Sequence, residues 1–108
     1  MSLKEKHCTP LDKNTRALDQ NQEEELLREL KGWEIDREKT HKLTKTIKTE
    51  TFMDAVRLIR KIAEISESEQ HHPDLHLYYN NLVVDLYSHK VGGLTMNDFI
   101  MAAKFDDL

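Results

Sequence analysis

The sequence predicts an α+β domain in which helices pack on one face of an antiparallel sheet of about four strands, in the order α-β-β-α-β-β-α. Apolar residues recur at helical spacing over 52–63, which is the strongest helix signal in the chain. The segments 43–49, 75–79 and 82–88 are rich in the side chains that favour strands. Because the strands come in neighbouring pairs, short turns can join them, and this favours antiparallel pairing.

A short helix is expected at the start of the domain. Asp19 and Gln22 have the spacing of a capping box, in which each residue satisfies a backbone N–H of the other. The leucines within 26–30 then mark one apolar face. Gly32 stands where a C-terminal glycine would end the helix.

The first strand pair consists of 33–35 and 43–49, with a polar turn at 36–39 between them. Both segments alternate in side-chain character, as strands with one wet face do. A long helix is expected next, with Thr51 as its N-cap residue. The apolar face of this helix is expected to cover the sheet.

The second strand pair is joined at Asn80-Asn81, a dipeptide that tolerates the positive φ of a tight hairpin. Thr95 and Asp98 then repeat the capping-box spacing ahead of an apolar run over 99–105. The chain is therefore expected to end in a third helix.

The length of 108 residues suits a single domain, which we expect over 17–108, behind a flexible N-terminal tail over 1–16 that is loosely ordered or docks on a neighbour. A formal net charge of -4 argues against direct nucleic-acid binding. The chain has neither the run of about 20 apolar residues that spans a membrane nor an apolar signal segment at its start. With a single cysteine, Cys8, it forms no internal disulfide, and we expect a cytoplasmic protein.

The most unusual motif is His71-His72-Pro73, preceded by Glu67 and followed by a lone His89. Imidazole titrates near neutral pH, so grouped histidines can act as general acids and bases. His-His-Pro alone is more typical of a surface turn. A zinc site formed by the three histidines is an alternative, although adjacent histidines in an extended turn point apart and no cysteine lies nearby.

These histidines belong to a longer series: His71-His72-Pro73, Tyr79-Asn80, Ser88-His89, Gly93-Leu94-Thr95 and Asp98, with Gly32-Trp33-Glu34, Phe52, Ala55 and Ala63-Glu64 upstream. The series resembles the pterin-4a-carbinolamine dehydratase family. The resemblance extends from about Leu18 to the C-terminus. No single element is specific, but the combination is.

The resemblance implies the small α+β fold of that family and its reaction, which removes water from a 4a-hydroxytetrahydropterin to give the quinonoid dihydropterin. This step serves tetrahydrobiopterin recycling. It implies no metal and no organic cofactor, a small-molecule pterin substrate, and a homodimer or homotetramer. It assigns catalytic roles to His71, His72 and His89, and substrate binding to Glu67, Pro73, Trp33 and Asp98.

Histidine suits this reaction, because hydroxide must be protonated as it leaves carbon and a base must take the neighbouring N–H proton. We expect His71 and His89 to flank the reacting edge, with the acid and base roles unassigned, and His72 to orient the substrate. Simpler roles exist for Asp98, as an N-cap partner, and for Trp33, as a core residue. Glu67 has a simpler role too, as a solvated charge at a helix end.

The chain departs from the family pattern at three places. Relatives often have an acidic residue or Asn at position 70, where this chain has Gln70, and a basic residue at position 97, where it has Asn97. The second strand is often rich in Phe, whereas this one has Ile47 and Thr49. These departures concern substrate preference and oligomer packing.

Two other functions stay open. The first is a protein-interaction module, since some animal members of the family also bind and stabilise a homeodomain transcription factor. The second is a dehydratase that acts on a related pterin, such as one of molybdopterin metabolism.

Overall fold

The computed structural model describes residues 2–108, which form three α-helices, one short 3-10 helix and a four-stranded sheet. In chain order the elements are η1 (Leu3–Glu5), α1 (Gln20–Leu27), β1 (Glu34–Asp36), β2 (Lys42–Lys48), α2 (Phe52–Glu69), β3 (Asp74–Tyr78), β4 (Asn81–Leu86) and α3 (Met96–Asp106). None of these helices is both long enough and apolar enough to cross a membrane.

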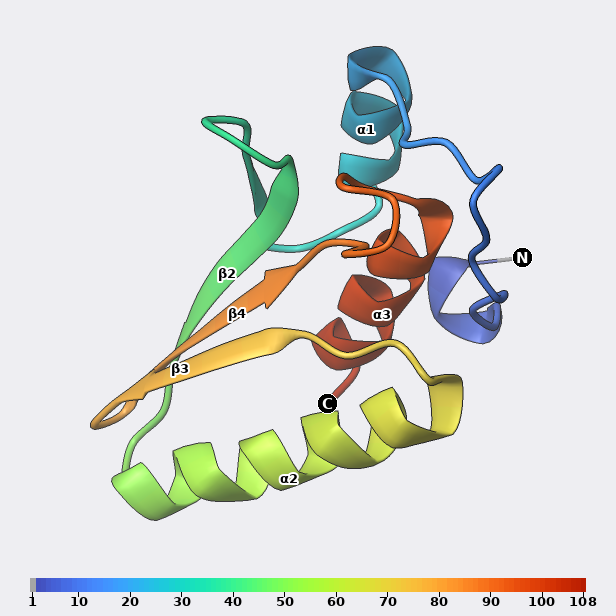
Figure 1. The fold of residues 1–108 in the computed structure, drawn as a ribbon. Coiled ribbons are helices and arrows are strands. Elements are labelled where there is room, and N and C mark those ends of the chain that lie inside the picture. The colour runs from blue at the N-terminus through green and yellow to red at the C-terminus, as the bar shows by residue number, and fades with distance from the viewer. Residues whose placement is uncertain (1) are drawn as a thin grey trace.

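The sheet has the strand order β1-β2-β4-β3, and every neighbouring pair is antiparallel. The three α-helices lie on one side of it (Figure 1). Side chains alternate along β3, where Leu75 and Leu77 are half-buried while Asp74, His76 and Tyr78 are exposed on the other face. The predicted α+β class and its element order are confirmed.

The predicted caps of the helices are present. The Asp19 side chain accepts a hydrogen bond from the backbone N–H of Gln22, and Thr51 does the same for Asp54. However, α1 ends at Leu27, before the predicted glycine. Gly32 instead adopts φ 78° in the turn that leads into β1, a conformation that glycine reaches without strain.

The hairpin between β3 and β4 turns at Tyr79-Asn80, one residue earlier than predicted. Tyr78 pairs with Asn81, so Asn81 already belongs to β4. Tyr79 takes the positive φ of 55°, and its ring stacks on Phe52 with ring centroids 6.5 Å apart. The sequence favoured asparagine for this conformation, but the register of the strands places tyrosine there.

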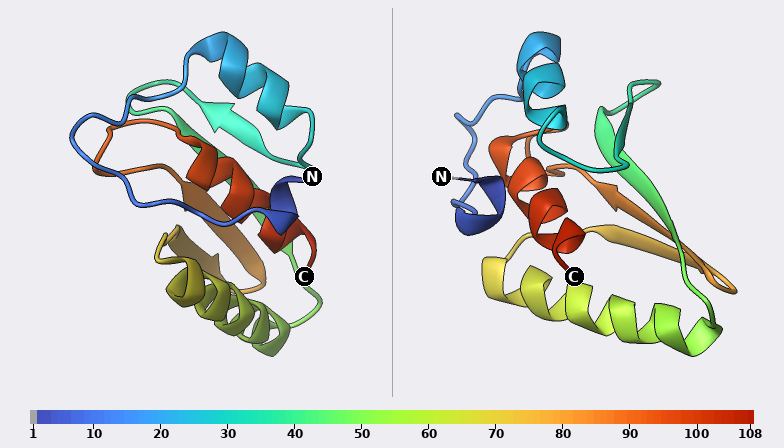
Figure 2. Two further views of the ribbon diagram at one scale, coloured as in Figure 1. Left: turned by 90° about the vertical axis from the view of Figure 1, so that its right-hand side faces the viewer. Right: turned by 180° about the vertical axis from the view of Figure 1, so that it is seen from behind.

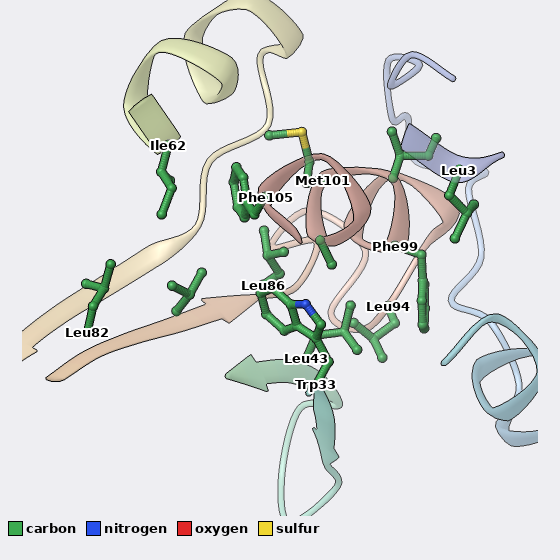
Figure 3. Close-up of a cluster of buried hydrophobic side chains, with 13 residues drawn as sticks. Leu3, Trp33, Leu43, Ile62, Leu82, Leu86, Leu94, Phe99, Met101 and Phe105 are labelled. Carbon is green, nitrogen blue, oxygen red and sulfur yellow. The ribbon is translucent and has the colours of Figure 1, made fainter. Parts of the chain in front are cut away.

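The hydrophobic core lies between the sheet and α3 (Figure 3). Leu43 and Leu86 lie on β2 and β4 beneath α3, which carries Phe99, whereas Leu82 lies farther along β4 on the side of Ile62 of α2. All five side chains are fully buried. Both faces of α3 are covered, and this is why its polar residues near the N-terminus are buried as well. As a result, α3 holds the carboxylate of Asp98 in the interior of the protein.

The N-terminal residues, predicted to be a tail, lie against α3 on the side away from the sheet (Figure 2). Leu3 in η1 is only 4% exposed and belongs to the core. The Lys104 side chain donates a hydrogen bond of 2.8 Å to the carbonyl of Lys4. Local sequence patterns do not indicate this packing, because a single leucine among polar residues shows no periodicity.

Candidate active site

The end of α2 positions the two adjacent histidines. Gln70 adopts a left-handed conformation, with φ 54° and ψ 41°, and so ends the helix. The N–H of His71 then donates to the carbonyl of Ser66 at 3.2 Å, which satisfies one of the last helical carbonyls. Pro73 prevents any continuation of the helix, so His71 and His72 lie in the short link into β3.

The strand register brings the remaining candidates to the same end of the sheet. Asp74 at the start of β3 pairs with Asp85 near the end of β4. Residues just before β3 and just after β4 are therefore neighbours in space, although they are far apart in sequence. In this way His71 and Ser88 both come within hydrogen-bond distance of Asp98, in the first turn of α3.

Asp98 is the centre of this group. Its side chain is fully buried, and its Oδ1 lies 2.6 Å from Nε2 of His71. Its Oδ2 accepts hydrogen bonds of 2.9 Å from the Ser88 hydroxyl and from the backbone N–H of Thr95. The hydroxyls of Ser88 and Thr95 are 2.8 Å apart. Asp98, which forms the capping box of α3 with Thr95, thus also contacts a histidine.

This arrangement orients the His71 ring. An ionised carboxylate can only accept hydrogen bonds, so Asp98 holds a proton on Nε2 and leaves Nδ1 as the free ring nitrogen. The N–H of Thr95 donates to the other oxygen of the same carboxylate and fixes its orientation. The side chain of His71 is 10% exposed, so it meets solvent over a small part of its surface.

His72 has a different partner. Its Nε2 lies within hydrogen-bond distance of Oε2 of Glu67, one turn back on α2. The two side chains are 53% and 73% exposed. The adjacent histidines therefore point to separate carboxylates, one inside the protein and one at its surface.

His89 is exposed beyond the end of β4. Its ring packs on Tyr87, with centroids 4.0 Å apart and an interplanar angle of 38°. Pro73 is half-buried between the histidines and β3. Both residues lie at the same end of the sheet as Asp98, in keeping with the strand register.

The structure places Trp33 elsewhere. It is 6% exposed within the core, and its Nε1 donates to Oδ1 of Asp106 at 2.9 Å. Asp106 is at the C-terminal end of α3, about 12 Å along the helix axis from Asp98. Lys45 lies over the indole at 5.8 Å from the ring centroid. Trp33 is therefore not brought together with the histidine group.

A hollow of about 420 Å³ opens beside His71. It is lined by Cys8, Thr9, Pro10, Leu11, Glu69, Gln70, His71, Lys90 and Asn97. Sequence reasoning assigned no site role to most of these residues. In the sequence, Asn97 stands out only as a departure from the family pattern, and nothing in the local sequence indicates that residues 8–11 reach the hollow.

Cys8 in this hollow is not a nucleophile. Burial, followed by the nearby negative charges of Glu69 and Asp98, raises the pKa of its thiol to about 12. The thiolate is the reactive form of cysteine, so at neutral pH this side chain behaves as a small apolar group. Within residues 2–108, no group of three or more His, Cys, Asp or Glu side chains has a geometry suited to a metal ion.

Comparison with known proteins decides the family. A model of the family described as pterin 4 alpha carbinolamine dehydratase matches residues 16–108. The chain belongs to this family. Dehydratases of this kind are hydro-lyases, so the protein is an enzyme, as the sequence predicted.

Individual relatives agree. The chain is 38% identical over 109 residues to pterin-4-alpha-carbinolamine dehydratase 2, a mitochondrial protein of Arabidopsis thaliana, and covers 58% of its length. It is 40% identical over 107 residues to a Methylococcus capsulatus protein provisionally given the same activity, and covers 93% of that protein. The predicted cytoplasmic location stays a prediction, because the plant relative is named as mitochondrial.

A solved structure shares the fold of this dehydratase-family chain. It is that of a transcriptional coactivator/pterin dehydratase from Brucella melitensis, with a TM-score of 0.80 and 29% sequence identity. The match covers 85% of this chain and 97% of the Brucella chain.

Proposed function

We propose that the protein dehydrates 4a-hydroxytetrahydropterins to quinonoid dihydropterins, by histidine general acid/base catalysis, in tetrahydrobiopterin recycling. The observation that carries this proposal is the buried Asp98 carboxylate 2.6 Å from Nε2 of His71, a histidine that also lines a hollow. A hollow of about 420 Å³ lies within the usual range for small-molecule pockets.

The reaction breaks the bond between carbon and the 4a-hydroxyl, and a double bond forms between that carbon and the adjacent ring nitrogen. A general acid protonates the departing hydroxide, which leaves as water, and a base takes the proton from the nitrogen. We assign these two transfers to His71 and His89, in an order that stays open. Asp98 stabilises the positive charge that His71 gains when it is protonated.

His72 and Glu67 have a separate part in this proposal. Their pair is exposed at the protein surface, where water screens its charge. A group of this kind contributes little to proton transfer in a dry site, but it can hydrogen-bond the polar edge of a substrate. We therefore assign substrate orientation to His72 and support of His72 to Glu67.

The test is stopped-flow decay of a 4a-hydroxytetrahydropterin in the presence of wild type and three variants. His71→Ala and His89→Ala are expected to lower the catalysed rate by about 10²- to 10⁴-fold, the usual contribution of one acid or base. His76→Ala is the matched control, because His76 is exposed on the far face of the sheet. A folded wild type without activity, or His71→Ala with wild-type activity, would contradict the proposal.

We also propose that the protein is a homodimer or homotetramer. The outer edge of β3 is unpaired within residues 2–108, and a free strand edge is usually covered in a stable protein. Light scattering coupled to size-exclusion chromatography measures the mass, and a monomer at micromolar concentration would contradict this.

An interaction module is the second candidate function. Its support is the structurally similar Brucella protein, which is named as a transcriptional coactivator as well as a dehydratase. The net charge of -4 makes a protein partner more suitable than DNA. A folded wild type that fails the stopped-flow test would shift the weight to this function, or to a dehydratase of a different pterin.

A further inference from the structure

The N-terminal residues Cys8–Leu11, which we call the strap, form part of the lining of the hollow beside His71. They precede the region matched by the family model, which begins at residue 16. Their position is not that of a loose tail, because side chains from α2 and α3 hold their backbone in place.

Asn97 is the first of these clamps. Its Oδ1 accepts a hydrogen bond of 3.0 Å from the N–H of Thr9, and its Nδ2 donates one of 2.8 Å to the carbonyl of the same residue. Asn97 is 4% exposed and neighbours Asp98 in the first turn of α3. A buried amide that pairs with both backbone groups of one residue fixes the path of the strap.

Glu69 and Lys90 bind the two ends of the strap. Glu69 Oε1 accepts a bond of 2.7 Å from the N–H of Cys8, and its Oε2 lies 2.7 Å from Nδ1 of His7. The Lys90 side chain donates to the carbonyl of Leu11 at 3.2 Å. The carboxylate of Glu69 is 9% exposed, so its bond to the strap is shielded from water.

These hydrogen bonds reduce the number of polar groups that the strap can offer to a ligand in the hollow. The N–H of Cys8, both backbone groups of Thr9 and the carbonyl of Leu11 are all engaged by the fold, and Pro10 has no N–H to offer. The Cys8 thiol is protonated at neutral pH. Besides Thr9, the lining residues of the strap contribute the Pro10 ring, the Leu11 side chain and the Cys8 sulfur, which we call the apolar wall.

We propose that this wall contacts the side of the pterin that bears its carbon substituent, and that Leu11 thereby helps to determine which substituted pterins the enzyme accepts. The hydrogen-bonding edge of a pterin needs donors and acceptors, whereas four backbone groups of the strap are already engaged by the fold. An alkyl substituent or ring face suits such a wall instead. This inference rests on the proposed function and adds a specificity determinant to it.

The experiment measures binding of two stable pterins, 7,8-dihydrobiopterin and unsubstituted 7,8-dihydropterin, by titration calorimetry. Leu11→Ala is expected to weaken 7,8-dihydrobiopterin binding by about tenfold or more, as loss of apolar contact in a pocket does. Binding of the unsubstituted pterin changes less. In the stopped-flow assay, Leu11→Ala raises KM and leaves kcat near wild type. Leu108→Ala, at a leucine 48% exposed outside the hollow, is the matched control.

A second variant displaces the strap without replacing a side chain of the apolar wall. Asn97→Ala removes both bonds to Thr9, so the strap moves and the same loss of 7,8-dihydrobiopterin affinity is expected. Its independent readout is the rate at which Cys8 reacts with 5,5′-dithiobis(2-nitrobenzoate), which rises when the strap detaches. Circular dichroism confirms that each variant is folded.

The outcomes separate the two proposals. If wild type turns over the hydroxypterin and Leu11→Ala binds both pterins as wild type does, the proposed role of Leu11 in specificity is contradicted. The proposed function then stands. If wild type binds pterins without turnover, the proposed function fails. The comparison of wild type with Leu11→Ala still shows whether the wall contacts the pterin substituent. A wild type that neither binds nor turns over pterins overturns both.

Discussion

Two neighbouring histidines of this protein face two carboxylates in opposite environments. The His71–Asp98 pair is 10% and 0% exposed, and the His72–Glu67 pair is 53% and 73% exposed. The first pair joins segments 27 residues apart, whereas the second spans a single helix end. Similar side chains at adjacent positions thus acquire different physical properties.

The difference shows that burial, rather than residue type, decides what a histidine–carboxylate pair can do. In the interior, water neither screens the pair nor competes for its hydrogen bonds, so ring and carboxylate stay in one geometry. At the surface the same pair contributes about 0–1 kcal/mol and exchanges with water. We therefore expect catalytic positioning from the first pair and weaker, adaptable contacts from the second.

The largest contrast is expected in stability. Asp98→Ala removes the capping-box partner of Thr95, leaves the Thr95 N–H without its acceptor and removes one acceptor of the Ser88 hydroxyl, so it should lower the free energy of unfolding by about 3 kcal/mol. Glu67→Ala should lower it by less than about 1 kcal/mol. Urea denaturation measures both, and equal losses would contradict the comparison.

The next contrast is kinetic and rests on the proposed function. Asp98→Asn keeps the shape of the side chain, but its one amide oxygen is needed to accept from the N–H of Thr95, so its NH2 group faces Nε2 of His71 and cannot accept the Nε2 proton. The dehydration rate should therefore fall by on the order of 10²-fold. Glu67→Gln should change the rate by less than about fivefold, because its partner is exposed. Stopped-flow assays of both variants decide this, and a larger effect of Glu67→Gln would reverse the roles assigned to the two pairs.

A smaller effect on stability is expected when the hydrogen bond from Ser88 to the His71–Asp98 pair is removed. Ser88→Ala removes the hydroxyl that donates to Oδ2 of Asp98, and should lower the free energy of unfolding by about 1–2 kcal/mol. Ser68→Ala is the matched control, because the Ser68 hydroxyl bonds a helix carbonyl at the exposed surface. Equal losses from the two serines would show that the Asp98 network contributes nothing beyond an ordinary hydrogen bond.

A third pair, Glu69 with His7, is intermediate, since the carboxylate is 9% exposed and the imidazole 79%. Burial acts to raise the pKa of Glu69, but the hydrogen bonds from His7 and from the Cys8 N–H outweigh it, so the pKa is lowered. A lowered pKa stabilises the folded state above the unfolded pKa of about 4.3, and this contribution is lost as pH falls through the folded value. In Glu69→Gln, the free energy of unfolding should therefore fall less than in wild type between neutral pH and a pH of about 3. Denaturation at each pH measures this difference.

Local patterns predicted most of the fold, because they depend on residues close in sequence. The Asp19 and Thr51 caps and the element order follow from spacing along the chain. The Asn80-Asn81 dipeptide predicts the turn one residue too late, because the pairing of Tyr78 with Asn81 depends on two strands and not on the dipeptide.

By itself, the sequence determined the fold class, the dehydratase family and the histidine and carboxylate residue types available for chemistry. Only the tertiary structure decided that Asp98 holds His71, that Trp33 bonds Asp106 within the core, and that the strap reaches the hollow. The physical reason is that these contacts join distant segments. Their geometry and burial depend on how α3 packs between the sheet and the N-terminus, and no local pattern of residues encodes that packing.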